Sequence, residues 1–326
     1  MKNWKKFLAV GAACSSLFFA HAEAAYQLND EVENPPAALQ MATQIGVLKY
    51  ENSTLRNLKD KDAIVVLSFG TTYKDQRTKS IDATAQAIAA AHPNAKVITA
   101  FTSHIVIKHI FENEGKCDYM TPEQTLDQLK REGYTRIALV SLDVIPGMEY
   151  KYDVALFHEY KDQFKKMTLA TPLMYWQGQE DQRDDVLEVM QSLHLPSFKK
   201  GTAILLMAHG TPDPSNAYYS VMQAKLKAMK RNDVHIYTVE GWPRLEDWAG
   251  KLKMHKVEKI ILMPLMMVAG DHANNDMAGD EEDSHKVILE KMGFKVETKL
   301  QGLGENKKIR NIFVERAAEA WEALVN

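Results

Sequence analysis

Cysteine is scarce in this chain, with two residues in 326, at Cys14 and Cys117. Cys14 lies in a segment that we expect to be removed, which leaves Cys117 without an intrachain partner. A disulfide-stapled scaffold needs paired cysteines and is therefore excluded. The chain is 45% hydrophobic and 25% charged. That composition favours a soluble protein with its own packed core, built as one large or two medium domains.

The chain also lacks an excess of positive charge and several catalytic motifs. Its formal net charge is −3, whereas nucleic-acid binding needs a clustered basic surface, so we expect no nucleic-acid partner. It has no GxSxG motif and no Walker loop, and "GLGENK" from 302 lacks the third glycine of a dinucleotide fingerprint. The acidic run 271–283 does not have the oxygen spacing of a Ca²⁺ loop. We therefore expect no nucleotide cofactor.

The N-terminus has the pattern of a targeting signal. Lys2, Lys5 and Lys6 precede the apolar run "FLAVGAACSSLFFA", and small residues follow in "AHAEAA". This predicts a signal peptide over residues 1–22 that is too short to span a bilayer permanently, and a periplasmic mature protein. Its removal would take away three lysines and lower the formal charge to about −6.

From Ala63 onward, short apolar or β-branched runs alternate with amphipathic segments, which favours parallel sheets covered by helices. "AIVVLSFGT" at 63–71 aligns without gaps on "AILLMAHGT" at 203–211. "RIALVSLDVIPGMEY" at 136–150 aligns in the same way on "KIILMPLMMVAGDHA" at 259–273. We therefore expect an α/β fold of two similar doubly wound parallel-sheet domains, produced by internal duplication, with a cleft between them.

The domain boundaries follow from this repeat. We expect an N-terminal arm at 23–60, a first α/β domain at 61–198 and a second at 199–326, whose C-terminal helix can pack back on the first. The arm contains Pro35-Pro36 and is expected to pack on its own domain or on a neighbouring subunit. A homo-oligomer therefore stays open.

Three potential metal ligands follow predicted strands of the second half: His209, Glu240 and His272. Each of them alone is more simply explained as a structural or solvated residue. Because the carboxyl ends of parallel strands meet at one edge of a sheet, we expect the three side chains to converge. Two imidazoles and a carboxylate bind a borderline divalent cation and leave a position open for a substrate.

The motifs "SFGTTY", "AFTS", "SLDVIPGMEY", "MAHGT", "VEGWP", "LMPLMMVAGDHANNDMAGD" and "GLGEN" resemble those of the CbiK-type anaerobic cobalt chelatases, which insert Co²⁺ into sirohydrochlorin. The resemblance implies a ferrochelatase-like fold with a tetrapyrrole cleft. It implies metal-binding roles for His209, Glu240 and His272, and catalytic roles for both histidines and for Glu149. Asp143 is a departure, because related sequences have a histidine there. The physiological metal stays open, since Co²⁺, Fe²⁺, Ni²⁺ and Zn²⁺ all accept this ligand set.

Metal insertion into a tetrapyrrole suits these residue types. The cation must lose water, and two pyrrole N–H protons must leave as the metal–nitrogen bonds form. Neutral imidazole can serve both as ligand and as proton acceptor near neutral pH. We expect His209 and His272 to bind the metal from one face, with one of them accepting a proton. Glu240 would compensate charge as a third ligand, and Glu149 would relay protons from the opposite domain.

Further side chains are candidates for contact with a carboxylate-rich macrocycle. Cations near the rim of the first half are Lys74, Arg77, Lys79 and Lys108, although each is more simply explained as part of a solvated helix face. Aromatic candidates for stacking or for interface packing are Tyr73, Tyr218, Tyr219 and Trp242. We assign His285, at the end of "EEDSH", to a solvated helix face.

The export signal keeps two other functions open. The protein could carry haem, another tetrapyrrole or a metal outside the cytoplasm, with little turnover. Alternatively, it could be a periplasmic metal-binding protein without a tetrapyrrole role. A carrier would copurify with its cargo, whereas an enzyme would release product repeatedly.

Overall fold

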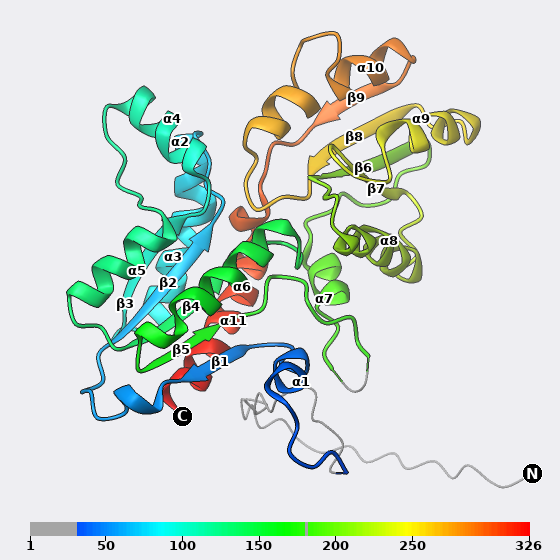
Figure 1. Ribbon diagram of the computed structural model, residues 1–326. Coiled ribbons are helices and arrows are strands. Elements are labelled where there is room, and N and C mark those ends of the chain that lie inside the picture. The colour runs from blue at the N-terminus through cyan, green and yellow to red at the C-terminus, as the bar shows by residue number, and fades with distance from the viewer. Residues whose placement is uncertain (1–30, 180–181) are drawn as a thin grey trace, which may run out of the picture.

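Two β-sheets, one in each half of the chain, form the framework of the computed structural model, which describes residues 31–179 and 182–326 (Figure 1). The first sheet has the order β1-β5-β4-β2-β3 and the second the order β7-β6-β8-β9. The strands are β1 Leu48–Glu51, β2 Asp62–Ser68, β3 Lys96–Phe101, β4 Arg136–Ser141, β5 Lys166–Leu169, β6 Thr202–Ala208, β7 Val234–Thr238, β8 Lys259–Pro264 and β9 Lys295–Thr298. The predicted signal peptide lies outside the described residues.

The two sheets repeat one topology. The order β3-β2-β4-β5 in the first corresponds to β7-β6-β8-β9 in the second, and all of these pairings are parallel. The strands that align in sequence, β2 and β6, occupy the same place, and the glycines after them have φ values of 89° at Gly70 and 90° at Gly210. The predicted α/β fold with two similar parallel sheets is confirmed.

One strand was not predicted. Leu48–Glu51, within the expected N-terminal arm, forms β1 and pairs antiparallel with β5, so that Leu48 lies opposite Leu169. The first sheet is therefore mixed, and this part of the arm packs on the chain's own first sheet. The antiparallel strand covers an edge that would otherwise present unpaired backbone groups.

The central strands are apolar because both faces of each sheet are covered. In β2, β4, β6 and β8 every residue after the first is buried, as expected for parallel sheets between layers of helices. The α-helices are α1 Ala37–Ala42, α2 Lys74–Gln76, α3 Ala83–Ala91, α4 His104–Glu114, α5 Pro122–Arg131, α6 Met148–Tyr160, α7 Asp185–Ser192, α8 Tyr218–Ala228, α9 Leu245–Met254, α10 His285–Lys291 and α11 Lys307–Val325. Within the described ranges, no helix combines the length and apolarity needed to cross a membrane.

The C-terminal helix ties the two halves together. Although α11 follows the second sheet in the chain, it packs against α3, β4 and β5 of the first (Figure 1). Its fully buried Arg316 donates to Asp185 Oδ1 over 2.8 Å. Asp185 Oδ2 accepts the backbone N–H groups of Tyr175 and Trp176. The buried carboxylate therefore holds α7, α11 and the segment after β5 in one arrangement.

Replacing Arg316 should test this tie. Arg316→Ala would remove one of the two arginines paired with the buried Asp185 carboxylate, while Arg183 Nε stays 2.6 Å from Asp185 Oδ1. Loss of a buried charged hydrogen bond of this kind costs about 1–3 kcal/mol. The free energy of unfolding, measured by denaturant titration, should fall by that amount. The exposed Arg56→Ala is the control and should change stability by less than about 0.5 kcal/mol. Equal effects of the two substitutions would contradict a structural role for the Arg316–Asp185 pair.

Candidate metal centre

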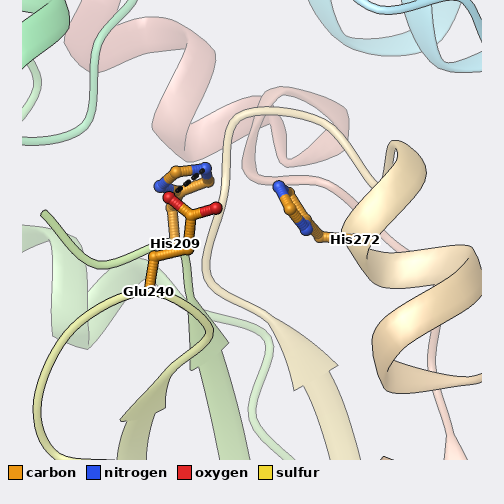
Figure 2. A group of neighbouring side chains, drawn as sticks. All are labelled: His209, Glu240 and His272. Carbon is orange, nitrogen blue, oxygen red and sulfur yellow. Dashed lines mark ion pairs between the residues drawn. The ribbon is translucent and has the colours of Figure 1, made fainter. Parts of the chain in front are cut away.

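His209, Glu240 and His272 gather at one edge of the second sheet (Figure 2). One potential ligand atom of each lies within 4.8 Å of the other two. His209 Nε2 is 4.0 Å from Glu240 Oε2, and the two imidazole centroids are 4.9 Å apart with their planes at 77°. The three residues come from the loops after β6, β7 and β8.

The register of the sheet brings these loops together. Ala208 at the end of β6 lies opposite Thr238 at the end of β7, and Met207 lies opposite Pro264 at the end of β8. Beyond the strands, the Glu240 N–H donates to His209 O over 2.8 Å. The parallel strands therefore deliver the three functional side chains to the same edge.

Two glycines allow the β6 and β7 loops to touch. A Cβ on Gly210 would lie 2.4 Å from the backbone nitrogen of Gly241, and the φ of 90° at Gly210 disfavours any other residue. A Cβ on Gly241 would lie 2.4 Å from Asn216 Oδ1. Larger residues at either position would push His209 and Glu240 apart.

Hydrogen bonds at Nδ1 orient both imidazoles. His209 Nδ1 lies 2.9 Å from Gly210 O, and His272 Nδ1 lies 2.6 Å from Asp276 Oδ2. A carbonyl or carboxylate oxygen only accepts, so in each neutral ring the proton is on Nδ1. The Nε2 lone pair of both histidines is then available to a metal.

Asp276 is a further candidate for the site that the sequence did not single out. It lies in the π-helical turn Ala273–Met277, four residues after His272. A His and an Asp spaced by four, just after a strand, were the available signal. A carboxylate behind a ligating histidine fixes the ring orientation and makes the imidazole a stronger ligand.

The donor set fits a divalent transition metal. The side chains of His209, Glu240 and His272 are 41%, 58% and 33% exposed, so a ligand can reach them from solvent. Ligand atoms at about 2.1 Å from a tetrahedral ion are about 3.4 Å apart, whereas these atoms lie within 4.8 Å of one another. The three groups must therefore draw inward by less than about 1 Å. Three protein ligands leave the remaining position open to a substrate, as in catalytic metal sites.

Glu149 lies on the first half, outside this three-residue group. It is in the first turn of α6 and is half-buried. A Cβ on Gly147 would lie 3.6 Å from Glu149 Oε2 and 3.8 Å from Ser215 Oγ, so Gly147 has Glu149 and a turn of the second half as neighbours. Asp143 follows β4, and its Oδ2 accepts a hydrogen bond from Ser141 Oγ over 3.0 Å. Burial, with the Glu149 carboxylate nearby, raises the pKa of Asp143.

Of the residues assigned from sequence to exposed positions, Arg77 is buried and His285 is half-buried. Arg77 is 4% exposed, donates to the Thr71 and Thr72 carbonyls and pairs with Glu114, so its prediction as a cation for substrate was wrong. His285 was also wrongly placed on a solvated face, because its Nδ1 lies 3.0 Å from Tyr237 Oη.

The other three cations are exposed. Lys79 pairs with Asp75 over 3.4 Å and Lys108 with Glu112 over 3.7 Å, and Lys74 is the third. Exposed pairs of this kind exchange readily, so these lysines stay available to an anionic substrate.

The aromatic candidates differ in their surroundings. Tyr73, from the first half, interacts with Asp271 and Asn275 beside His272, and burial raises its pKa. The Tyr218 hydroxyl donates to Tyr175 O over 2.6 Å, and buried Tyr219 accepts the Gly210 N–H over 3.2 Å. Trp242 is 58% exposed. Packing therefore explains Tyr218 and Tyr219, whereas Trp242 offers a surface on which a flat ligand can stack.

Comparison with known proteins identifies the family. Residues 62–322 match the family described as Cobalt chelatase (CbiK). The chain belongs to this family. The sirohydrochlorin cobaltochelatase of Salmonella typhimurium is 35% identical over 267 residues, covering 81% of this chain and 98% of that protein. The sirohydrochlorin cobaltochelatase CbiKC of Nitratidesulfovibrio vulgaris is 32% identical over 235 residues, covering 71% and 81% of the two chains.

A solved chelatase structure has the same fold. SirB of Bacillus subtilis, solved with Fe³⁺, superposes with a TM-score of 0.54 at 16% identity, covering 82% of this chain and 96% of SirB. The likeness at this identity concerns the fold alone.

Removing the carboxylate behind His272 should weaken metal binding. Asp276→Asn keeps the size of the side chain but loses its charge, and changes of this kind cost about 10–100-fold in metal affinity. Isothermal titration with Co²⁺ should show that loss. Asp283→Asn, in the same acidic stretch and exposed, is the matched control and should bind as the wild type does. Unchanged affinity in Asp276→Asn would contradict the proposed orientation of His272.

Proposed function

We propose that this protein is a sirohydrochlorin cobaltochelatase, an enzyme that inserts Co²⁺ into sirohydrochlorin without a nucleotide. The observation that carries the proposal is the half-exposed His209–Glu240–His272 group, found in a chain of the cobalt chelatase family. Relatives at 35% and 32% identity bear the name of this activity.

The residues suggest how the reaction proceeds. His209 and His272 hold Co²⁺ through Nε2, and Glu240 offsets part of its charge. The macrocycle approaches from the exposed side of the three residues. As metal–nitrogen bonds form, two pyrrole N–H bonds break, and an imidazole that has released the metal can accept one of the protons.

Glu149 contributes from the opposite half. Its carboxylate lies across from the Ser215 turn, in the loop region that follows His209. We assign it to proton transfer rather than metal binding, because the metal-binding group is complete without it. Exposed Lys74, Lys79 and Lys108 would attract the carboxylates of the substrate.

The finer assignments rest on the sequence. Export by residues 1–22 would place the enzyme in the periplasm, and domains at 61–198 and 199–326 would each contribute one face of the site. Fe²⁺, Ni²⁺ or Zn²⁺ can occupy the same ligands. Binding of haem and assembly into a homo-oligomer belong to the same set of proposals.

Metal insertion can be measured directly. The full-length protein mixed with sirohydrochlorin and Co²⁺ should accelerate the absorbance change of insertion over the spontaneous reaction. His209→Ala and His272→Ala should each lower kcat by about 100-fold or more, the range expected for loss of a group that transfers protons. His255→Ala is the control, because His255 is exposed at the opposite end of the second sheet, after α9.

Three outcomes would contradict the proposal in different ways. If the wild-type protein did not accelerate Co²⁺ insertion over the spontaneous reaction, the proposed enzymatic activity would be contradicted. Tight retention of one tetrapyrrole per chain without turnover would identify a carrier. Full activity in both histidine variants would show that the reaction occurs elsewhere on the chain.

A further inference from the structure

Two carboxyl groups meet inside the first half, next to the proposed site. Asp153 lies on α6 and is 1% exposed. Asp143 follows β4 and is half-buried, and its carboxyl group interacts with that of Asp153. Neither residue has a place in the metal-binding group or in the steps described so far.

The hydrogen bonds around this pair are incomplete if both groups are ionised. The Ser141 hydroxyl donates to Asp143 Oδ2 over 3.0 Å and accepts the Asp143 N–H over 3.2 Å. The Ser141 hydroxyl also interacts with Asp153. Because a hydroxyl has only one proton, it cannot donate a hydrogen bond to both carboxylates at once. Both oxygens of Asp153 are buried without a donor. A proton on one carboxyl group supplies the missing donor, directed at the other carboxylate.

The surroundings also favour a shared proton. Glu149, Tyr150 and Tyr152 on α6 interact with the pair, and all three are acids. Burial, together with the Glu149 carboxylate, raises the pKa of both aspartates. Two adjacent buried carboxylates cannot both ionise at low cost. A single proton shared between the two groups would meet both this electrostatic demand and the missing hydrogen-bond donor at Asp153.

Glu149 connects the pair to the metal-binding loops. Its charge acts on Asp143 on one side and on Tyr219 on the other. The Tyr219 oxygen accepts the N–H of Gly210, the residue directly after His209. Glu149 is thus the group between the buried pair and the loop that carries the metal-binding histidine.

We propose that the Asp143–Asp153 pair takes up one of the two protons released on metal insertion, with Glu149 as the intermediate carrier. This inference rests on the proposed function. When two pyrrole N–H bonds break, their electron pairs stay on nitrogen and form metal–nitrogen bonds. One proton passes to a Glu149 oxygen and then to the pair, which changes from one bound proton to two. The other passes to an imidazole that has released the metal and from there to solvent on the exposed side of the site, and release of product lets the pair return its extra proton through Glu149.

The shared proton can be tested without any activity assay. The raised pKa means that the folded pair keeps a proton that the unfolded chain releases above about pH 4. Its stabilising contribution is present at low pH and is lost as the pH rises through the folded pKa. Asp153→Asn places an amide donor beside Asp143 and removes this contribution. The variant should therefore lose less Tm than the wild type between about pH 5 and pH 8.

The control is Glu159→Gln, an exposed position on the same helix, which should keep the wild-type pH dependence. Identical pH dependence in Asp153→Asn and the wild type would overturn the shared proton. If Asp153→Asn folds poorly, the same Tm measurement can be made on Asp143→Asn, whose amide can donate a hydrogen bond to Asp153 in the same way.

Kinetics test the transfer itself. With sirohydrochlorin and Co²⁺, Asp143→Asn and Asp153→Asn should each lower kcat by about 100-fold, the lower end of general acid–base contributions, and flatten its pH profile. The KM for Co²⁺ should stay unchanged, because neither side chain belongs to the metal-binding group.

The outcomes separate this inference from the proposed function. An unchanged kcat and pH profile in both variants would overturn the inference alone. A raised KM for Co²⁺ with unchanged kcat would also overturn it, since the pair would then act on metal binding. Failure of the wild type to insert Co²⁺ would instead overturn the proposed function, and the stability test would still decide whether the pair shares a proton.

Discussion

The hydrogen bond from the Glu240 N–H to His209 O is the contact on which the metal centre depends. It continues the β6–β7 pairing beyond both strands, so the two residues leave the sheet side by side. Gly210 and Gly241 permit the close approach of their loops. Asn216 then clamps them, since its Oδ1 accepts the Thr211 N–H and its Nδ2 donates to Trp242 O. Side-chain chemistry at this edge is thus fixed by backbone geometry.

Duplication explains why the two halves contribute different chemistry. In the ungapped alignments, Phe69 stands where the second half has His209, and Glu149 stands where it has His272. The same turns of the same fold therefore present imidazoles on one half and an exposed phenylalanine and a carboxylate on the other. The side chains of the second half are suited to binding a cation, whereas the carboxylate of the first half is suited to transferring protons.

Much of this arrangement could be predicted from the sequence. The strands were evident from their apolar runs, and the meeting of His209, Glu240 and His272 followed from the rule that parallel strands end at one edge. Such inferences depend only on local pattern and sheet topology. They place residues at an edge of the sheet without specifying the partners of each side chain.

What could not be predicted depends on contacts between distant segments. The burial of Arg77 involves its partner Glu114 from α4, and the half-buried position of His285 involves Tyr237 from β7. The meeting of Asp143 and Asp153 depends on how α6 packs against the end of β4. Asp276 is an exception, because the sequence shows its spacing of four residues from His272. The sequence does not show the π-helical turn that directs the Asp276 carboxylate toward the imidazole.

The most direct test of the central claim is the structure of the Co²⁺-loaded protein, with the ion located by its anomalous scattering. The account predicts one ion bound by His209 Nε2, His272 Nε2 and a Glu240 oxygen, each at about 2.0–2.2 Å, with a position open to solvent. An ion held instead by the acidic stretch that contains Glu282 and Asp283, or by Nδ1 of either histidine, would contradict it.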